Sequence, residues 1–308
     1  MSTDRGESAQ SGESGASARS VRPSGQRPAA GTVRPRAHCT VDGDGRIALR
    51  ITTPVTPATM TSRPRLLLRL RPPKGRPEQI KHVFDLEPAA DPGHWQTTIG
   101  PEPTLEEGRW DPYLLPAATD PADTSRQRLL PGVRDLRALV TGRAPGTTPS
   151  PLAVRIPYVT LDGYLALRTW LRTAHAEVDR VHVTDAAMSV QGRLFGTDLG
   201  AGAVAVLRRR GKGGPVREAE LTAQYAHTFS FTAPYQDLLE APGTAGPGLW
   251  DVFVRPSADT LLVRTARLLD DVADRKKVFV YPASTLDALE ARPYYTVDND
   301  LAVEITGG

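Results

Sequence analysis

The sequence contains a single cysteine, Cys39, and no apolar run long enough to cross a membrane. One cysteine excludes an intramolecular disulfide and any metal site built from several thiolates. Because its neighbours "HCTV" alternate as in a strand, we interpret Cys39 as a buried structural thiol rather than a nucleophile. Met1 is followed by no apolar segment of the kind found in signal peptides. We therefore expect a soluble, cytoplasmic protein.

The first 36 residues, Met1 to Arg36, contain no aromatic residue and consist mainly of Ser, Gly, Pro, Ala and Arg. Such a composition cannot bury enough apolar surface to offset the entropy lost on ordering, so this segment is predicted to be a disordered tail. Its six arginines and three acidic residues give it a net charge of +3, equal to that of the whole chain. The remaining body is neutral, which argues against nucleic acid as a partner.

The body of the chain repeats itself. The segment Gly108–Val140 aligns with Gly248–Val280, and both contain Gly-x-Trp-Asp followed by Arg-Leu-Leu. Four more blocks recur in the same order at offsets between 136 and 145 residues, among them "HVFDLEP" at His82 with "HTFSFTAP" at His227. We infer two copies of one module, 37–172 and 179–308.

Short apolar or alternating runs separated by Gly, Pro and Asp fill each copy, which is typical of β-strands. About seven such runs per copy predict an all-β protein of two tandem immunoglobulin-like β-sandwiches behind the disordered tail. Trp110 and Trp250 each open a strand and are predicted to be core residues. The segment Ser284–Arg292 is predicted to be a short helix with Ser284 as its N-cap.

The triplet Asp298-Asn299-Asp300 raises the question of a metal site, because an Asp-x-Asp pair can hold a divalent cation against a diphosphate. The first copy has Leu161-Asp162-Gly163-Tyr164-Leu165 at the matching place, with only one carboxylate. Residues of this type tolerate the positive φ of tight hairpin loops. We therefore interpret both stretches as hairpin tips and predict no metal site and no cofactor. The histidine pairs are interpreted as strand residues with satisfied hydrogen bonds.

The Gly-x-Trp-Asp strand and the terminal "PYYTVDNDLAVEI" resemble the C-terminal immunoglobulin-like accessory domains of bacterial teichoic-acid glycosyltransferases and related glycerophosphotransferases. The matching residues are Leu249, Trp250, Asp251, Phe253, Arg264, Arg267, Leu268, Tyr294, Tyr295, Thr296 and Leu301. In that family the modules follow a nucleotide-sugar or CDP-glycerol-binding catalytic domain, whereas this chain contains no strand–helix–strand succession and no glycine-rich phosphate loop. The resemblance thus implies an accessory role: oligomerisation, or contact with an anionic glycopolymer or with a separate catalytic subunit.

Both copies carry cations after the matching third strand. They are Arg69, Arg71, Lys74 and Arg76 in the first copy, and Arg208, Arg209, Arg210 and Lys212, with Arg217 beyond, in the second. One interpretation is solvated hairpin tips that protect an edge strand from pairing. The other is a bivalent site for an anionic polymer.

Two ion pairs are also predicted from the repeat. Asp251 is expected to pair with Arg264 or Arg267, and Asp111 with Arg126 or Arg128.

These observations favour a non-catalytic accessory, oligomerisation or polymer-binding protein linked to cell-envelope glycopolymer synthesis. No residue is assigned a catalytic role. The alternative is a glycosyl- or glycerophosphotransferase acting on a cell-wall polymer, or a detached piece of one, and a third possibility is a polyanion binder unrelated to cell walls.

Overall fold

The computed structural model of the chain describes residues 34–53, 63–78, 81–116, 126–140, 143, 147–239 and 246–307. The predicted tail, 1–36, lies outside these ranges except for its last three residues, and the first strand already begins at Arg36. Within the described ranges, neither helix has the length or the apolar character needed to cross a lipid bilayer.

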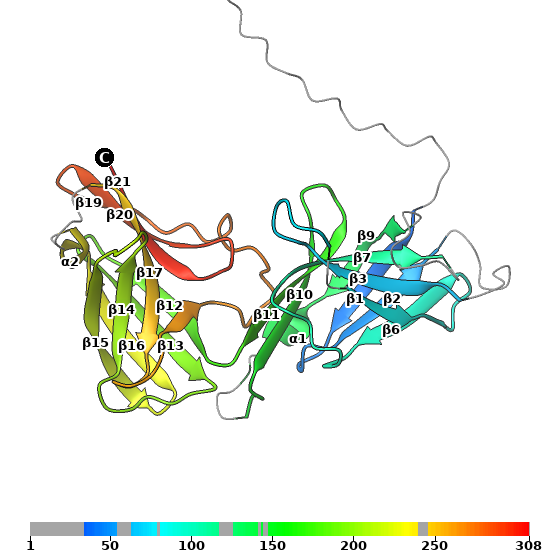
Figure 1. Cartoon of the computed structure of the whole chain (residues 1–308), viewed down its shortest axis with the longest axis horizontal. Coiled ribbons are helices and arrows are strands. Elements are labelled where there is room, and N and C mark those ends of the chain that lie inside the picture. Colours follow the sequence, from blue (N-terminus) through cyan, green and yellow to red (C-terminus); the bar gives the residue numbers. More distant parts are fainter. Residues whose placement is uncertain are drawn as a thin grey trace, which may run out of the picture. The chain divides into compact units, whose positions relative to one another are not determined.

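The first half of the fold consists of two antiparallel-rich sheets (Figure 1). Five strands follow the order β5-β6-β2-β1-β9, and a second sheet follows β10-β11-β7-β3-β4, with β8 beside β7. The bounds are β1 (Arg36–Val41), β2 (Ile47–Thr52), β3 (Arg65–Leu70), β4 (Lys81–Asp85), β5 (Glu87–Pro88), β6 (His94–Ile99), β7 (Gly108–Leu115), β8 (Gln127–Arg128), β9 (Leu130–Asp135), α1 (Arg137–Val140), β10 (Leu152–Val159) and β11 (Leu165–Arg172).

The second half forms one continuous ladder, β14-β15-β16-β13-β12-β18-β17-β21-β20-β19. Because β14 also pairs with β17, the run from β14 to β17 closes into a ring of strands. The bounds are β12 (His175–Val183), β13 (Ala187–Phe195), β14 (Val204–Arg209), β15 (Val216–Tyr225), β16 (Thr228–Pro234), α2 (Tyr235–Leu239), β17 (Gly248–Arg255), β18 (Val263–Ala266), β19 (Ser284–Leu286), β20 (Leu289–Tyr295) and β21 (Leu301–Gly307). The prediction of a mostly β protein is confirmed, and this half is a closed ladder rather than two separate sheets.

Strand pairings recur between the halves. The antiparallel pairs β1–β2, β2–β6, β3–β7, β3–β4, β7–β11 and β10–β11 have counterparts in β12–β13, β13–β16, β14–β17, β14–β15, β17–β21 and β20–β21. The parallel pair β1–β9 likewise corresponds to β12–β18. These pairings correct one block of the sequence alignment. His82 lies in β4, whose counterpart is β15, whereas His227 directly precedes β16, the counterpart of β6.

The two repeated tryptophans occupy matching core positions. Trp110 stands opposite Leu70 on β3, and Trp250 stands opposite Arg209 on β14. Both are buried, each in its own hydrophobic cluster. The Trp110 indole N–H also donates hydrogen bonds to the Glu106 carbonyl and to Thr169 Oγ1, at 3.0 and 3.1 Å. The prediction that both tryptophans are core residues is confirmed.

The predicted helix at Ser284–Arg292 is wrong, because this segment forms the β19–β20 hairpin. Leu286 pairs with Leu289, and Asp287 between them has a φ of 54°, which a helix does not allow. The Ser284 hydroxyl donates to the Thr184 carbonyl, 2.8 Å away, instead of capping a helix. A helix of so few residues has little stability of its own. The pairing of β20 with β21 therefore decides the conformation of this segment.

The two predicted hairpin tips are confirmed. Val159 pairs with Leu165 across the first, and Tyr295 pairs with Leu301 across the second. The positive φ values fall on Gly163 at 82° and on Asn299 at 63°. Both residue types tolerate this region of backbone space, which is why the sequence places them there.

Removing either repeated tryptophan tests its role in the core. Trp110→Ala and Trp250→Ala should each lower the free energy of unfolding by about 3–5 kcal/mol, since each deletes a large buried ring and leaves a cavity. Chemical denaturation followed by circular dichroism measures the change. Tyr225→Ala is the control, because Tyr225 is 77% exposed and its removal should change stability by less than about 0.5 kcal/mol. A similar loss in all three variants would contradict the assignment.

Cys39 is buried, as predicted, and burial raises the pKa of its thiol to about 12, against a smaller lowering by the charge of Arg134. About one thiol in ten thousand is then ionised at pH 8, and the thiolate is the reactive form. Iodoacetamide should therefore leave the native protein unmodified at pH 8 over an hour and alkylate it within minutes in guanidinium chloride. Intact-mass measurement distinguishes the two, and rapid alkylation of the native protein would show an accessible thiol.

Candidate functional site

The predicted cations gather at two corresponding turns. Arg69 lies in β3, next to its last residue, and Arg71, Lys74 and Arg76 follow in the segment before β4. In the second half Arg208 and Arg209 end β14, and Arg210 and Lys212 lead toward β15. We call these the first turn (residues 71–76) and the second turn (residues 210–214).

Each turn begins with an arginine held by the aspartate that follows the repeated tryptophan. Arg71 donates to both Asp111 carboxylate oxygens, at 2.8 and 2.6 Å. Arg210 donates twice to Asp251 Oδ1, at 2.9 and 2.6 Å. The hydrogen bonds to these carboxylates raise the pKa of both guanidinium groups. The repeated unit is therefore Trp-Asp plus the arginine after the neighbouring strand.

The predicted partners of these aspartates are partly correct. Arg128 does lie 3.3 Å from Asp111. Asp251, however, pairs with Arg210 and not with Arg264 or Arg267. Arg264 instead pairs with Asp300, at 2.8 Å, and Arg267 with Asp270, at 3.3 Å.

Arg126, the other partner predicted for Asp111, forms an ion pair with Glu78 at 3.2 Å. The same carboxylate forms an ion pair with Arg69, whose Nε lies 2.8 Å away. Glu78 thus neutralises one residue of the predicted cationic set. Its two arginine partners come from segments on either side of it in the chain.

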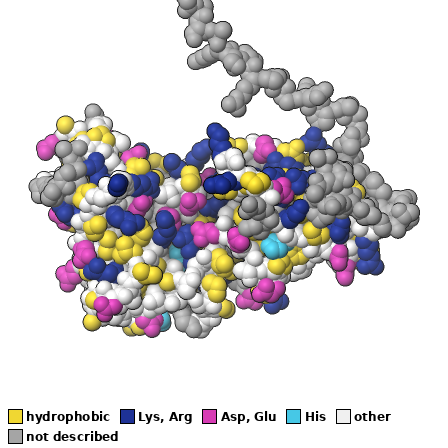
Figure 2. All heavy atoms as spheres, viewed as in Figure 1, with side chains coloured by type: hydrophobic (Ala, Val, Ile, Leu, Met, Phe, Trp, Pro, Cys, Tyr) yellow, Lys and Arg dark blue, Asp and Glu magenta, His cyan; other side chains and the backbone are white. Residues whose placement is uncertain are grey.

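The rest of the cationic set divides into anchored and free side chains. The Arg208 guanidinium lies 4.9 Å from the centre of the Phe253 ring, and Arg209 donates to the Pro247 carbonyl at 2.8 Å. Lys74, Arg76 and Lys212 are exposed, and no carboxylate of the described ranges pairs with them. Figure 2 shows Lys and Arg intermixed with Asp and Glu over the visible face, as expected for a neutral body. Within this set, the free positive charge is thus confined to the tips of the turns.

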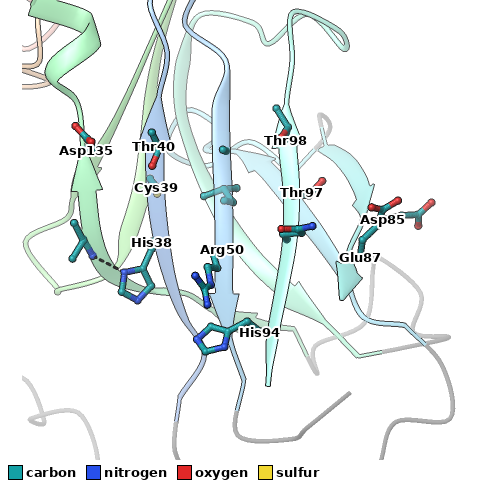
Figure 3. A pocket seen from close by; sticks show the side chains of 14 residues that line it. His38, Cys39, Thr40, Arg50, Asp85, Glu87, His94, Thr97, Thr98 and Asp135 are labelled. Atoms are coloured by element: carbon teal, nitrogen blue, oxygen red, sulfur yellow. Dashed lines mark hydrogen bonds between the residues drawn. The ribbon is translucent and has the colours of Figure 1, made fainter. Parts of the chain in front are cut away.

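A hollow of about 1010 Å³ lies on the outer face of the five-stranded sheet (Figure 3). His38 and Arg50 stand opposite each other on β1 and β2, and His94 lies on the next strand, β6. His38 Nδ1 accepts a hydrogen bond from the Val133 backbone N–H at 3.2 Å. This histidine therefore has the strand role predicted for it. The hollow is broad, and its outward-facing residues are mainly polar.

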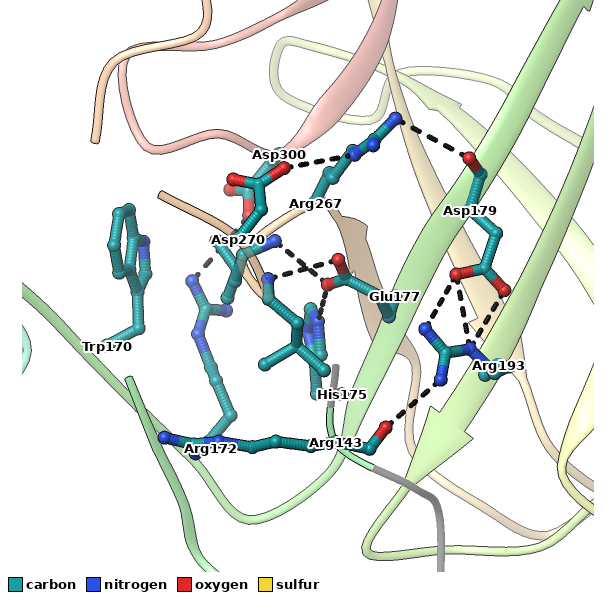
Figure 4. A network of polar contacts seen from close by, with 12 residues as sticks. Arg143, Trp170, Arg172, His175, Glu177, Asp179, Arg193, Arg267, Asp270 and Asp300 are labelled. Atoms are coloured by element: carbon teal, nitrogen blue, oxygen red, sulfur yellow. Dashed lines mark hydrogen bonds and ion pairs between the residues drawn. The ribbon is translucent and has the colours of Figure 1, made fainter. Parts of the chain in front are cut away.

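A buried polar network joins the segment after β18 to β12 (Figure 4). The Glu177 carboxylate accepts the backbone N–H groups of Leu268 and Leu269, at 2.8 and 3.1 Å. His175 Nε2 lies 2.7 Å from the same carboxylate. Both side chains are almost completely buried. Glu177 thus satisfies donors that would otherwise be left without partners in the interior.

The Asp298–Asp300 tip takes part in this buried region, which its assignment as a simple hairpin did not predict. Asp298 forms an ion pair with Arg168 of β11, and its carbonyl accepts the Trp170 indole N–H at 3.0 Å. Asn299 is fully buried, and its amide group binds the backbone of two residues in the segment 272–275, at 3.1 Å each. The tip of the β20–β21 hairpin therefore contacts β11, the last strand of the first half.

Asp300 completes this contact with Arg264 at 2.8 Å and with Arg172 at 3.6 Å. Burial raises the pKa of Asp300, and the positive charges of Arg172 and Arg264 oppose the shift. The two acidic side chains of the triplet therefore bind arginines.

A smaller pocket of about 250 Å³ lies beside the second turn. Its lining residues are Arg210, Leu249, Lys276, Phe279, Val280, Tyr281, Arg292, Pro293, Tyr294 and Glu304. Arg210 is the one member that sequence reasoning had selected as a binding residue. Tyr294 is a second lining residue that the sequence could have indicated, from the alternation of side chains along β20. Only one of the two adjacent tyrosines, Tyr295, is fully buried. The segment 276–281 could not be found in this way, since it forms no strand.

No protein-family model matches the chain. No curated protein matches it either. Among solved structures, S. aureus TarS is similar at 13% identity with a TM-score of 0.28, over 64% of this chain and 34% of that chain. Residues 217–571 of S. aureus TarS are similar at 12% identity with a TM-score of 0.27, over 75% of this chain and 62% of that chain. In each case the match spans less than two thirds of the neighbour.

The Glu177 network predicts a large effect from one carboxylate. Glu177→Ala should lower the free energy of unfolding by about 3–5 kcal/mol, because two buried backbone N–H groups and His175 lose their acceptor. Glu177→Gln retains an acceptor oxygen and should cost clearly less. Glu220→Ala, an exposed glutamate in β15, is the matched control and should change stability by about 0.5 kcal/mol at most. Urea denaturation measures all three, and equal values for Glu177→Ala and Glu220→Ala would contradict the network.

Proposed function

We propose that this chain is a non-catalytic accessory protein that binds an anionic glycopolymer in the cytoplasm and supports cell-envelope glycopolymer synthesis. A separate glycosyl- or glycerophosphotransferase, or a second copy of this chain, is the proposed protein partner. The proposed organisation is a tail, 1–36, followed by two immunoglobulin-like modules, 37–172 and 179–308. The recurrence of seven strand pairings and of the Trp-Asp-Arg unit supports the duplication.

The observation that carries the binding function is the arrangement of charge at the two turns. Asp111 and Asp251 hold the first arginine of each turn, which orders the start of the turn. Beyond that point Lys74, Arg76 and Lys212 are exposed and have no acidic partner in the described part of the chain. Ammonium and guanidinium groups presented in this way bind phosphate oxygens through charge-assisted hydrogen bonds.

Two such turns on one chain give a bivalent site. Both belong to the same compact unit, Val33–Gly308. Once one turn is bound, the second binds a neighbouring repeat of the polymer at a high effective concentration. A repetitive polyanion would therefore be retained more strongly than its monomer, without a deep pocket at either turn.

Charge reversal at the turn tips tests this function. The triple variant Lys74→Glu, Arg76→Glu, Lys212→Glu should lose at least about tenfold in affinity for immobilised poly(glycerol phosphate) and should elute at lower salt, because exposed ionic contacts are screened. Lys212→Glu alone should cause a large part of the loss, since it removes one of the two contacts.

The matched control reverses three exposed arginines elsewhere: Arg46→Glu, Arg137→Glu and Arg180→Glu. This variant has the same net charge and should keep most of its retention. Equal losses in the two triple variants would show that total charge, rather than the turns, determines retention. Unchanged retention in the turn variant at both low and physiological salt would refute the proposal. Recovery of a glycosyl- or glycerophosphotransferase with the wild-type chain from lysate tests the proposed partner separately.

A further inference from the structure

We propose that the pocket beside the second turn binds a single phosphorylated sugar or polyol unit. This inference rests on the proposed function only for the source of the ligand, which is one repeat of the polymer. The chemistry of the ligand follows from the residues that line the pocket. The pocket is distinct from the turn tips, because Lys74, Arg76 and Lys212 do not line it.

The pocket combines a sheet surface with an irregular segment. Leu249 of β17 pairs with Glu304 of β21, which in turn pairs with Arg292 of β20, so these three residues form one row across neighbouring strands. Tyr294 is two residues along from Arg292 and therefore projects on the same side. The segment 276–281 supplies Lys276, Phe279, Val280 and Tyr281 to the lining.

The charges of the pocket favour a singly charged anion. Arg292 is paired with Glu304 at 2.8 Å, and Arg210 is held by Asp251. Lys276 has no ion pair in the described part of the chain, and its Nζ lies 5.9 Å from the centre of the Tyr294 ring. The site thus has one positive charge in excess, which matches the single negative charge of a phosphodiester. Arg210 and Arg292 can still donate their remaining N–H groups to phosphate oxygens.

The other walls suit the carbon skeleton of a sugar or polyol. Tyr281 and Tyr294 contribute aromatic rings, and Leu249, Val280 and Pro293 contribute apolar surface. Such surfaces pack against C–H groups, and the Tyr294 hydroxyl, which already accepts a hydrogen bond from Arg210, can still donate one of its own. Burial raises the pKa of Tyr294, against an opposing effect of Arg210. Its hydroxyl therefore stays neutral at physiological pH and does not repel an anion.

The volume sets the size of the ligand. About 250 Å³ accommodates one small unit and not several linked units. The broad hollow on the five-stranded sheet is about four times larger but has no tyrosine in its lining, so it offers no comparable ring surface. Of the two, only the smaller pocket combines aromatic rings with an unpaired cation.

Calorimetric titration of the full chain tests the inference. Glycerophosphoglycerol, a phosphodiester, and glucose 1-phosphate, a phosphomonoester, should bind with dissociation constants in the millimolar range or below. Inorganic phosphate and glucose should each bind at least about tenfold more weakly, since each supplies only half of the contacts. Tighter binding of the diester indicates an internal polymer unit as the source, and tighter binding of the monoester indicates a free or terminal unit.

Lys276→Glu should weaken glycerophosphoglycerol binding at least about tenfold. Lys277→Glu is the matched control, because Lys277 is the exposed neighbour that does not line the pocket, and it should bind within about twofold of the wild type. Tyr294→Phe should retain binding of the diester and Tyr294→Leu should lose it, with thermal unfolding used to confirm that both are folded. Absence of binding at 20 mM ligand, or equal binding by Lys276→Glu and the wild type, would overturn the inference.

Failure of this inference and failure of the proposed function give different results. Retention of poly(glycerol phosphate) without binding of the small ligands would refute the pocket and leave polymer binding at the turns in place. Binding of the small ligands without retention of the polymer would refute the proposed function and leave the pocket in place. The turn variant Lys212→Glu should bind the small ligands normally.

Discussion

Burial of Asn299 and Asp300 at the tip of the β20–β21 hairpin is the interaction on which the arrangement around it depends. A carboxylate or amide in the interior is tolerated only when its hydrogen-bonding groups find partners. Here the partners come from β11, from β18 and from the segment that follows it. One three-residue stretch therefore determines where several otherwise unconnected segments lie. Replacing it with an apolar loop would leave the buried Arg168 side chain without its carboxylate partner.

The same physical requirement shapes the surface. Arginines close to the sheets are neutralised by carboxylates that the fold brings to them, as in the repeated Arg71–Asp111 and Arg210–Asp251 pairs. Of the eight cations predicted as binding residues, only Lys74, Arg76 and Lys212, which lie beyond the last strand residues, escape neutralisation or anchoring within the described part of the chain. The fold thus reduces a large set of sequence cations to Lys74 and a few others at the turn tips. A count of basic residues in the sequence overstates the charge available to a ligand.

Local rules predicted well where the local sequence controls the backbone. Gly163 and Asn299 fit the positive φ of their turns, and Trp110 and Cys39 are buried as their alternating neighbours indicated. The same rules were wrong for the helix expected at Ser284, where strand pairing outweighed a weak local preference. They also equated His82, in β4, with His227, which lies in the turn before β16, a strand that is not the counterpart of β4. Short similar stretches can align by composition, whereas strand pairing is a property of the whole sheet.

The sequence by itself determined that the chain is mostly β, that its strand pattern is repeated, and where its tight turns and core tryptophans lie. These features depend on residue type and on periodicity along a few neighbouring positions. Only the tertiary structure decided that the second half closes into a ring, that Asp251 pairs with Arg210, and that the segment 276–281 lies against β20. Each of these involves groups that are far apart in the chain. Their contacts follow from sheet register and from the need to satisfy buried charge, neither of which a local pattern records.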